Sequence, residues 1–182
     1  MPRTRSPAAR GFTLVEILIV IGVIAILAGV AIPWLLQARI AANEASAIAS
    51  LSAINSAQAA YRIACGGGRF YAPTLTALGT PHPVTGEAFI SPDLALGDQV
   101  AKSGYLIRMA GIPPADAVGA RPTCTGAEPA AGYAAAADPL RPGWSGRRYF
   151  ATNTSRAIYE HTESLADRMP GDGPPPAGRE VR

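Results

Sequence analysis

The feature that most constrains this chain is an uninterrupted apolar stretch near its N-terminus. Residues 17–36 contain no charged side chain, and the next charge after Glu16 is Arg39. At about 1.5 Å per residue, twenty helical residues cover roughly 30 Å, which is the hydrocarbon thickness of a bilayer. The stretch therefore predicts a membrane-spanning helix. The basic residues before it favour a cytoplasmic N-terminus, with the rest of the chain translocated.

The net charge of the chain is concentrated before this stretch. Arg3, Arg5 and Arg10 all precede Phe12, and no acidic residue does. Without these three arginines the 16 basic residues fall to 13, which equals the number of acidic residues. The formal charge of +3 thus belongs to the first eleven residues. It is poor evidence for nucleic-acid binding, and nucleic acid is not an expected partner.

Two simpler interpretations of the apolar stretch remain open at this point. A secretory signal peptide has an apolar region of about 7–15 residues before a small-residue cleavage site. The stretch is too long for that, although residues 45–47 form a loose cleavage match. The other interpretation is a plain, unprocessed anchor. Neither accounts for Glu16, because an ionisable group at the edge of an apolar segment is costly and is usually functional.

Residues 10–16, with the sequence RGFTLVE, resemble the class III signal of type IV prepilins and of the pseudopilins of type II secretion. In that family a prepilin peptidase cuts after the glycine and methylates the new N-terminal residue. The resemblance implies cleavage between Gly11 and Phe12, and N-methylation of Phe12. Pro33 would be the twenty-second mature residue and resembles the family's proline, whereas Ala25 stands where many pilins carry a glycine.

The spacing of Phe12 and Glu16 has a chemical meaning of its own. The new amino terminus at Phe12 is a cation, and Glu16 lies four residues on, about one helical turn away. In a stack of parallel helices, Glu16 of one subunit is placed to neutralise the Phe12 amine of its neighbour. A paired buried charge costs far less than an unpaired one. We hypothesise that this pairing orders the subunits during assembly.

Helical patterning continues beyond the apolar stretch. Pro33 is predicted to kink the helix rather than end it, because it removes only one hydrogen bond and the pattern resumes at once. Apolar residues at helical spacing form one stripe: Leu36, Ile40, Ala47, Leu51, Ile54 and Tyr61. Polar residues fall largely off it: Arg39, Asn43, Glu44, Ser46, Ser50, Ser52 and Asn55. The glycines at 66–68 are predicted to stop the helix, since the context of a phosphate loop is missing around them.

The second half predicts a small antiparallel sheet. Strands are expected at residues 103–112, 132–137, 147–152 and 156–161, with a turn at 153–155. Residues 69–98 are interpreted as a loop with one helical turn at most. The expected fold class is α+β, with a sheet of three or four strands packed on the exposed half of the long helix. This order of elements resembles the pilin fold.

The resulting domain organisation has five parts. Residues 1–11 are a leader cleaved after Gly11, residues 12–36 the transmembrane and assembly half of the helix, and residues 37–65 its amphipathic half. A loop-rich domain with the sheet follows at residues 66–169. Residues 170–182 are rich in proline, glycine and charge and are predicted to be a disordered tail.

The two cysteines, Cys65 and Cys124, predict one disulfide, because their number is even and the chain is destined for export. Two unrelated buried thiols are the alternative. In the pilin-like fold this bridge would tie the end of the helix to the loop between two strands. Closing so long a loop contributes up to about 4 kcal/mol in the chain-entropy model.

The remaining titratable residues give no pattern for catalysis or metal binding, so the chain is not expected to be an enzyme and no cofactor is assigned. His82 and His161 are interpreted as solvated histidines. An acidic group fits no calcium loop motif: Glu160, Glu163, Asp167 and Asp172. A group with aromatic residues among its arginines is either a DNA-contacting face or, as we favour, the polar side of a sheet: Arg141, Trp144, Arg147, Arg148, Tyr149, Phe150 and Arg156.

The sequence thus predicts a prepilin that is cleaved, methylated and polymerised through its N-terminal helix as a structural subunit of a type IV pilus-like filament. A pseudopilin of a type II secretion system is the alternative, and a membrane-anchored binding module that never polymerises is a third. The implied partners are copies of itself and other pilins, the prepilin peptidase, an inner-membrane assembly platform, and lipid before assembly. The implied location is the bacterial inner membrane and then a surface filament.

Overall fold

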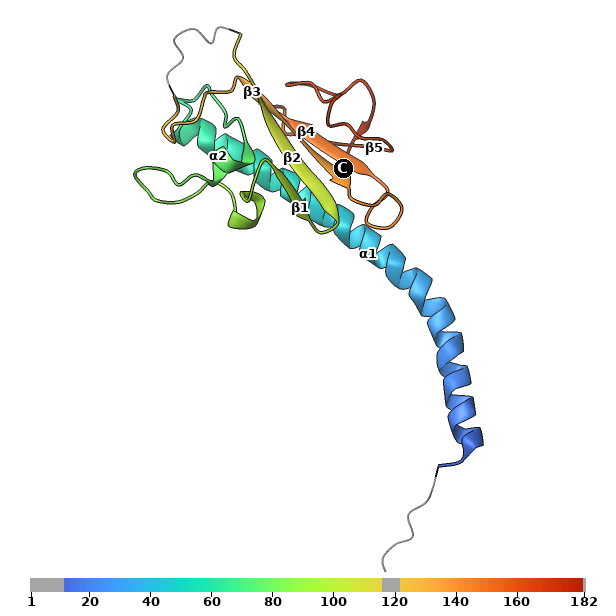
Figure 1. Cartoon of the computed structure of the whole chain (residues 1–182). Helices are drawn as coiled ribbons and strands as arrows, with labels where there is room; N and C mark the ends of the chain where they lie inside the picture. Colours follow the sequence, from blue (N-terminus) through green and yellow to red (C-terminus); the bar gives the residue numbers. More distant parts are fainter. Residues whose placement is uncertain (1–11, 116–121, 182) are drawn as a thin grey trace, which may run out of the picture. The chain divides into compact units, whose positions relative to one another are not determined.

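The computed structural model describes residues 12–115 and 122–181 (Figure 1). The chain separates into two compact units, the first ending at Ala38 and the second beginning at Arg39. Helix α1 (Leu14–Ala64) contributes its first half to one unit and its second half to the other. The predicted leader, residues 1–11, lies outside the described residues.

The first unit consists of the N-terminal half of α1. Thr13 caps this helix, because its side-chain oxygen accepts a hydrogen bond of 3.3 Å from the backbone N–H of Glu16. Its carbonyl oxygen accepts a second, of 3.4 Å, from the N–H of Ile17. These bonds satisfy donors that have no partner within the first turn. The helix runs on through Pro33, and the kink at that residue stays a prediction.

In the second unit α1 packs one face into the core. The predicted apolar stripe is buried there: Ile40, Ala47, Leu51, Ile54 and Tyr61. The same face also buries Glu44, Ser50 and Asn55, so the prediction that they lie off the buried side is wrong. Polar groups are tolerated inside when they are hydrogen-bonded. Asn55, for example, accepts hydrogen bonds from Tyr133 at 2.9 Å and from Thr152 at 3.0 Å.

The glycine triplet ends α1, as predicted. The N–H of Gly66 bonds to the carbonyl of Tyr61, and that of Gly68 bonds to the carbonyl of Arg62. Gly67 and Gly68 have φ angles of 59° and 75°, in the left-handed region that glycine enters without steric cost. A Cβ on Gly66 would lie 1.8 Å from the carbonyl oxygen of Phe70. This turn needs glycine.

The sheet is antiparallel throughout, and its strands follow one another in chain order. Figure 1 shows it beside the second half of α1. The strands are β1 (Gln99–Lys102), β2 (Tyr105–Ile112), β3 (Gly132–Pro139), β4 (Tyr149–Asn153), β5 (Ile158–His161) and β6 (Arg179–Glu180). The α+β pilin-like arrangement predicted from the sequence is therefore confirmed.

The described sheet has six strands where the sequence predicted three or four. The four central strands, β2 to β5, match the predicted ones. The added strands are the two edges: β1 has four residues, of which only Val100 is buried, and β6 has two exposed residues. Such short edge segments have too little apolar alternation to be recognised in sequence.

Two short helices lie between α1 and the sheet in the chain. Helix α2 (Leu75–Gly79) is capped by Thr74, whose hydroxyl accepts a hydrogen bond from the N–H of Ala77, and it buries Leu75 and Leu78. A 3-10 turn, η1 (Pro92–Leu94), follows and buries Leu94. The sequence predicted one helical turn at most for residues 69–98; α2 is that turn, and η1 is a second one that the prediction missed.

Both faces of the central strands are covered. The main core joins α1 and α2 to one face through large side chains, including Tyr105, Ile107, Tyr133 and Phe150. A smaller cluster covers the other face with Leu165 and Met169, which follow β5. Apolar contacts on both faces explain why the alanines of β3 form a nearly continuous buried run.

The C-terminal segment is ordered as far as the structure describes it, so the prediction of a disordered tail is wrong for residues 170–181. Asn153 donates hydrogen bonds to the carbonyls of Pro170, at 2.9 Å, and Gly173, at 2.7 Å. Strand β6 then pairs with β5, and Arg179 binds Glu160. Proline and glycine raise the apparent disorder of a sequence, but here their carbonyls are fixed by partners elsewhere in the fold.

Candidate processing and assembly site

The predicted processing site, between Gly11 and Phe12, lies just before α1 in the sequence. Gly11 lies outside the described residues, whereas Phe12 is described and 72% exposed. Thr13 precedes the helix, and Glu16 lies in its first turn, where a negative charge is favoured by the helix dipole. Thr13 and Glu16 have the spacing of a capping box. The carboxylate of Glu16 thus projects from a helical turn that begins right after the Phe12 backbone.

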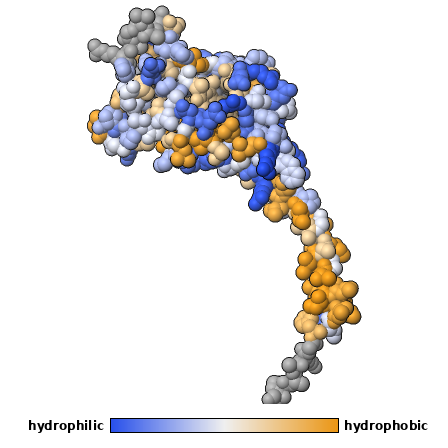
Figure 2. Space-filling model, viewed as in Figure 1, coloured by the Kyte–Doolittle hydropathy of each residue, from blue (hydrophilic) through white to orange (hydrophobic). Residues whose placement is uncertain are grey.

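The first half of α1 is apolar and uncovered. From residue 12 to residue 38 no side chain is buried, and Figure 2 shows hydrophobic residues along this unit. The helix is long and apolar enough to cross a membrane. Large exposed side chains alternate around it, including Leu18, Ile21, Leu27 and Val30. A continuous apolar surface of this size needs lipid or other helices to cover it.

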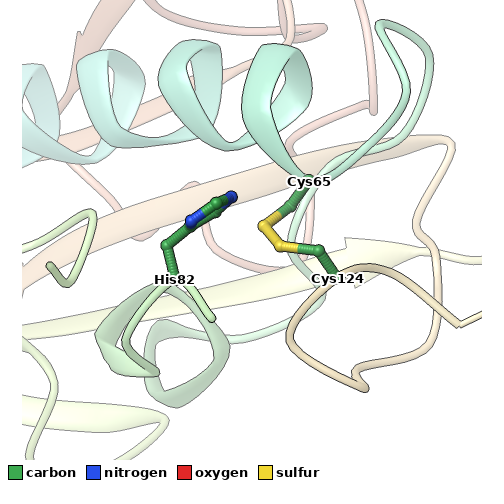
Figure 3. Close-up of side chains that lie close together, drawn as sticks. All are labelled: Cys65, His82 and Cys124. Atoms are coloured by element: carbon green, nitrogen blue, oxygen red, sulfur yellow. A yellow bond between two sulfur atoms is a disulfide. The ribbon is translucent and has the colours of Figure 1, made fainter. Parts of the chain in front are cut away.

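In the second unit the two cysteines form the predicted disulfide. Cys65, at the end of α1, is bonded to Cys124, in the loop before β3, with Cα atoms 4.8 Å apart. Figure 3 shows the ring of His82 beside the sulfur atoms. His82 accepts hydrogen bonds at Nδ1 from the N–H groups of Val84 and Thr85. A loop far from both cysteines in sequence therefore packs against the bridge.

A series of ion pairs connects α1 with strands β5 and β6. The Arg148 guanidinium binds Glu44 of α1, at 2.6 Å, and Glu160 of β5, at 2.5 Å. Glu160 also accepts a hydrogen bond from Arg179 of β6 at 2.5 Å. The backbone N–H groups of Arg147 and Arg148 donate to the second oxygen of Glu44. The side chains of both acids are only 7% exposed, so each depends on these donors.

The pKa of Glu160 depends on two opposing effects, burial and hydrogen bonding. Burial of the carboxyl acts to raise its pKa, but the hydrogen bonds from Arg179 and Arg148 act the other way and prevail, so the pKa is lowered. Burial also raises the pKa of Arg148's neighbour in the core, Tyr105, well above its usual value. The carboxylate of Glu160 is therefore held charged in the folded protein.

Comparison with known proteins concerns the N-terminal segment. A family model described as the prokaryotic N-terminal methylation motif matches residues 7–32. The type IV wide pilus major component PilA4 of Thermus thermophilus is 53% identical over 55 residues, which cover 30% of this chain. The chain spans 42% of the length of that relative. Both matches support a type IV pilin-like character for the N-terminal segment. The pilin-like arrangement of this chain consists of α1, the antiparallel sheet and the Cys65–Cys124 disulfide.

The methylation motif covers most of the residues predicted to act in processing and assembly of this pilin-like chain. Gly11, Phe12 and Glu16 all lie within residues 7–32, whereas Pro33 follows directly after them. The structure places Phe12 and Glu16 together at the start of α1 and Pro33 within the same helix. The roles of these residues in cleavage, methylation, assembly and kinking stay predictions.

The other residues singled out from the sequence do not form one site. In the acidic group, Glu160 binds Arg148 and Arg179, Glu163 binds Arg168, and Asp172 accepts from Thr154. The residues of the arginine and aromatic group also have separate contacts. Arg148 is bound by two carboxylates, and the aromatic ring of Phe150 is fully buried. Glu160, Arg148 and Phe150 therefore serve the fold of the second unit.

Sequence reasoning missed two features, one in each unit. The first is the cap at Thr13, although a threonine three residues before a glutamate is its signature. The second is the pairing of Glu44 with Arg148, which lie 104 residues apart. No local pattern announces a contact of that separation.

Proposed function

We propose that this chain is a structural subunit of a type IV pilus-like filament, which assembles through the first half of α1. One observation carries the proposal: a prepilin-type methylation motif leads directly into an apolar helix with no buried side chain between residues 12 and 38. This surface has no function in the fold of its own chain. Its role is in contacts with lipid before assembly and with other subunits afterwards.

Small residues along this half of α1 support helix-to-helix packing. A Cβ placed on Gly22 or on Gly29 would have no atom within 4 Å, so both positions are open to a neighbour. In membranes, small residues let helices approach closely and gain dispersion contacts. Bundled copies of α1 would thereby replace lipid with protein at little cost in free energy.

Processing supplies the charge that Glu16 requires. We propose that a prepilin peptidase cleaves after Gly11 and methylates Phe12, which creates a cationic amine one turn from Glu16. In the apolar bundle this amine and the Glu16 carboxylate of an adjacent subunit neutralise each other. An unpaired charge in such surroundings costs several kcal/mol. Subunits are therefore retained in the register at which the two charges meet.

The remaining parts of the proposal concern place and partners. The basic residues before Phe12 favour a cytoplasmic N-terminus, and a disulfide fits an exported second unit. The partners are copies of the chain, other pilins, the prepilin peptidase and an inner-membrane assembly platform. The similarity to a pilus component favours a pilus over a secretion pseudopilus. The proposed activity is structural and not enzymatic.

Glu16 substitutions test the assembly step in cells that carry the assembly machinery. Glu16→Gln keeps a residue type that is compatible with a capping box but removes the charge, so we expect cleaved subunits and few filaments. Glu16→Asp is the matched control, because it keeps the charge and is expected to retain much of the filament yield. Immunoblots separate the cleaved from the uncleaved chain, and sheared filaments are weighed against total subunit. Wild-type yield with Glu16→Gln contradicts the proposed pairing.

A further inference from the structure

The loop between β3 and β4 exposes an unusual set of side chains at one end of the second unit. Trp144 is 69% exposed, and Leu140 is 52% exposed. Arg141 and Arg147 are exposed beside them. Among the described ion pairs neither arginine has a carboxylate partner. We propose that this loop contacts the headgroups of anionic phospholipids while the subunit resides in the membrane.

Backbone hydrogen bonds hold the loop around the exposed Trp144 in a tight turn. The N–H groups of Trp144 and Ser145 bond to the carbonyl of Arg141 at 3.0 and 2.9 Å. The hydroxyl of Ser145 in turn accepts a bond from the N–H of Arg141. Gly143, with a φ of 84°, allows the tight turn. An exposed tryptophan on a rigid loop is ready to bind without a large loss of conformational entropy.

The loop contacts α1 close to the first residues of the second unit, which begins at Arg39. Asn43 of α1 donates a hydrogen bond of 2.9 Å to the carbonyl of Ser145, and Glu44 accepts from the backbone of Arg147. Along the helix, Asn43 follows Leu36 by seven residues, which correspond to about 10 Å. Headgroups extend roughly 5–8 Å beyond the hydrocarbon on each side of a bilayer. The contact of this loop with α1 therefore begins only seven residues after the predicted membrane-spanning stretch.

The chemistry of the loop selects lipid over a second protein as its occupant. Tryptophan is enriched where one side of the ring meets hydrocarbon and the other meets water. Arginines beside it are attracted to anionic headgroups. The only acid of α1 at this end, Glu44, is buried and already bound by Arg148. Arg39, four residues before Asn43 on the same helix, is also exposed.

This inference rests on the proposed insertion of α1 into a bilayer, and one experiment tests both. The full chain is reconstituted into vesicles of phosphatidylcholine, with or without phosphatidylglycerol, that contain a headgroup spin-labelled lipid as quencher. The chain has two tryptophans, so Trp34→Phe leaves Trp144 as the reporter of the loop. Trp144→Phe leaves Trp34 as the reporter of insertion.

We expect quenching of Trp144 in vesicles with phosphatidylglycerol, and much weaker quenching without it. Near an anionic surface each arginine favours the bound loop by about five-fold. The double substitution Arg141→Gln and Arg147→Gln is therefore expected to lower the contact equilibrium by about 25-fold. Ile63→Trp, introduced without the two native tryptophans, is the matched control, because Ile63 is 79% exposed near the far end of α1. Its fluorescence is expected to be insensitive to the quencher.

Each other outcome overturns the inference. Quenching of Trp34 without quenching of Trp144 shows an inserted helix with a free loop, and only the lipid contact fails. Absence of quenching at both tryptophans contradicts the lipid contact and also the proposed insertion of α1 into the bilayer. Equal quenching of Trp144 in both vesicles excludes recognition of anionic lipid. A change in Trp144 emission that follows the protein-to-lipid ratio instead identifies a second copy of the chain as the occupant.

Discussion

Replacement of Arg148 by methionine removes the link between α1 and the C-terminal strands. The substitution keeps much of the side-chain volume but deletes every charged donor. Glu44 loses contacts of 2.6 and 2.8 Å, and Glu160 loses one of 2.5 Å. Both carboxylates stay buried, with 7% of each side chain exposed. The variant therefore leaves two negative charges inside the protein with fewer partners.

The expected loss in free energy of unfolding depends on the hydrogen-bond donors that remain for Glu44 and Glu160. Removal of one partner from a buried ion pair usually costs about 3–5 kcal/mol. Here Arg148 is 42% exposed, and water screens part of the pairing. Glu160 retains Arg179, and Glu44 retains two backbone N–H donors. We therefore expect the free energy of unfolding to fall by about 2–3 kcal/mol, below the usual range.

Denaturant unfolding of the full chain in detergent, followed by near-ultraviolet circular dichroism, measures this loss. Arg147→Met is the matched control, because Arg147 is adjacent and exposed and its side chain has no carboxylate partner among the described ion pairs. We expect it to change stability by less than about 0.5 kcal/mol. Equal effects of the two substitutions would refute the reasoning, since they would show that the buried acids do not depend on Arg148.

Three further results are expected for the second unit. Reduction of the Cys65–Cys124 bridge, which joins residues 59 apart, should lower the free energy of unfolding by up to about 4 kcal/mol; an unchanged denaturation midpoint with reductant argues against this. Because the pKa of Glu160 is lowered in the folded protein, its stabilising charge is present above the unfolded pKa of about 4.3 and is lost as pH falls through the folded value. Thermal melting from about pH 6 to about pH 3 should therefore show a shallower decline for Glu160→Gln than for wild type. Leu165→Ala, at a fully buried position, should cost about 2–5 kcal/mol, whereas Leu96→Ala, 81% exposed, should leave the melting curve unchanged.

The sequence predicted the parts of the fold that repeat a simple pattern. The apolar stripe from Ile40 to Tyr61 has helical spacing, and the structure buries it. The central strands have enough alternation and flanking turn residues to be located within a few residues. The helix end followed from the glycine triplet, because few other roles require three consecutive glycines. Each of these features depends on neighbours in the chain.

The missed features depend on distant partners. The polar residues Glu44 and Asn55 are buried only because Arg148, Tyr133 and Thr152 meet them from the sheet. The C-terminal segment is ordered because its carbonyls and side chains bind groups that precede it by many residues. His82 reaches the disulfide through the folding of a separate loop. Composition and periodicity contain no information on such contacts.

The candidate site, in contrast, could be assigned almost entirely from local sequence. Its assignment rests on residues 10–16, where the order of residue types is itself informative, and the methylation-motif match covers the same segment. The structure added the cap by Thr13 and showed that no side chain of residues 12–38 is buried.

The most direct test of the central claim is the intact mass of the chain extracted from the membranes of cells that contain a prepilin peptidase. The account predicts a chain that begins at Phe12 and carries one added methyl group on its amine. Gly11→Val, which blocks the narrow cleavage position, should leave the leader attached. A wild-type chain that still begins at Met1, or that begins after Ala47, would contradict the account.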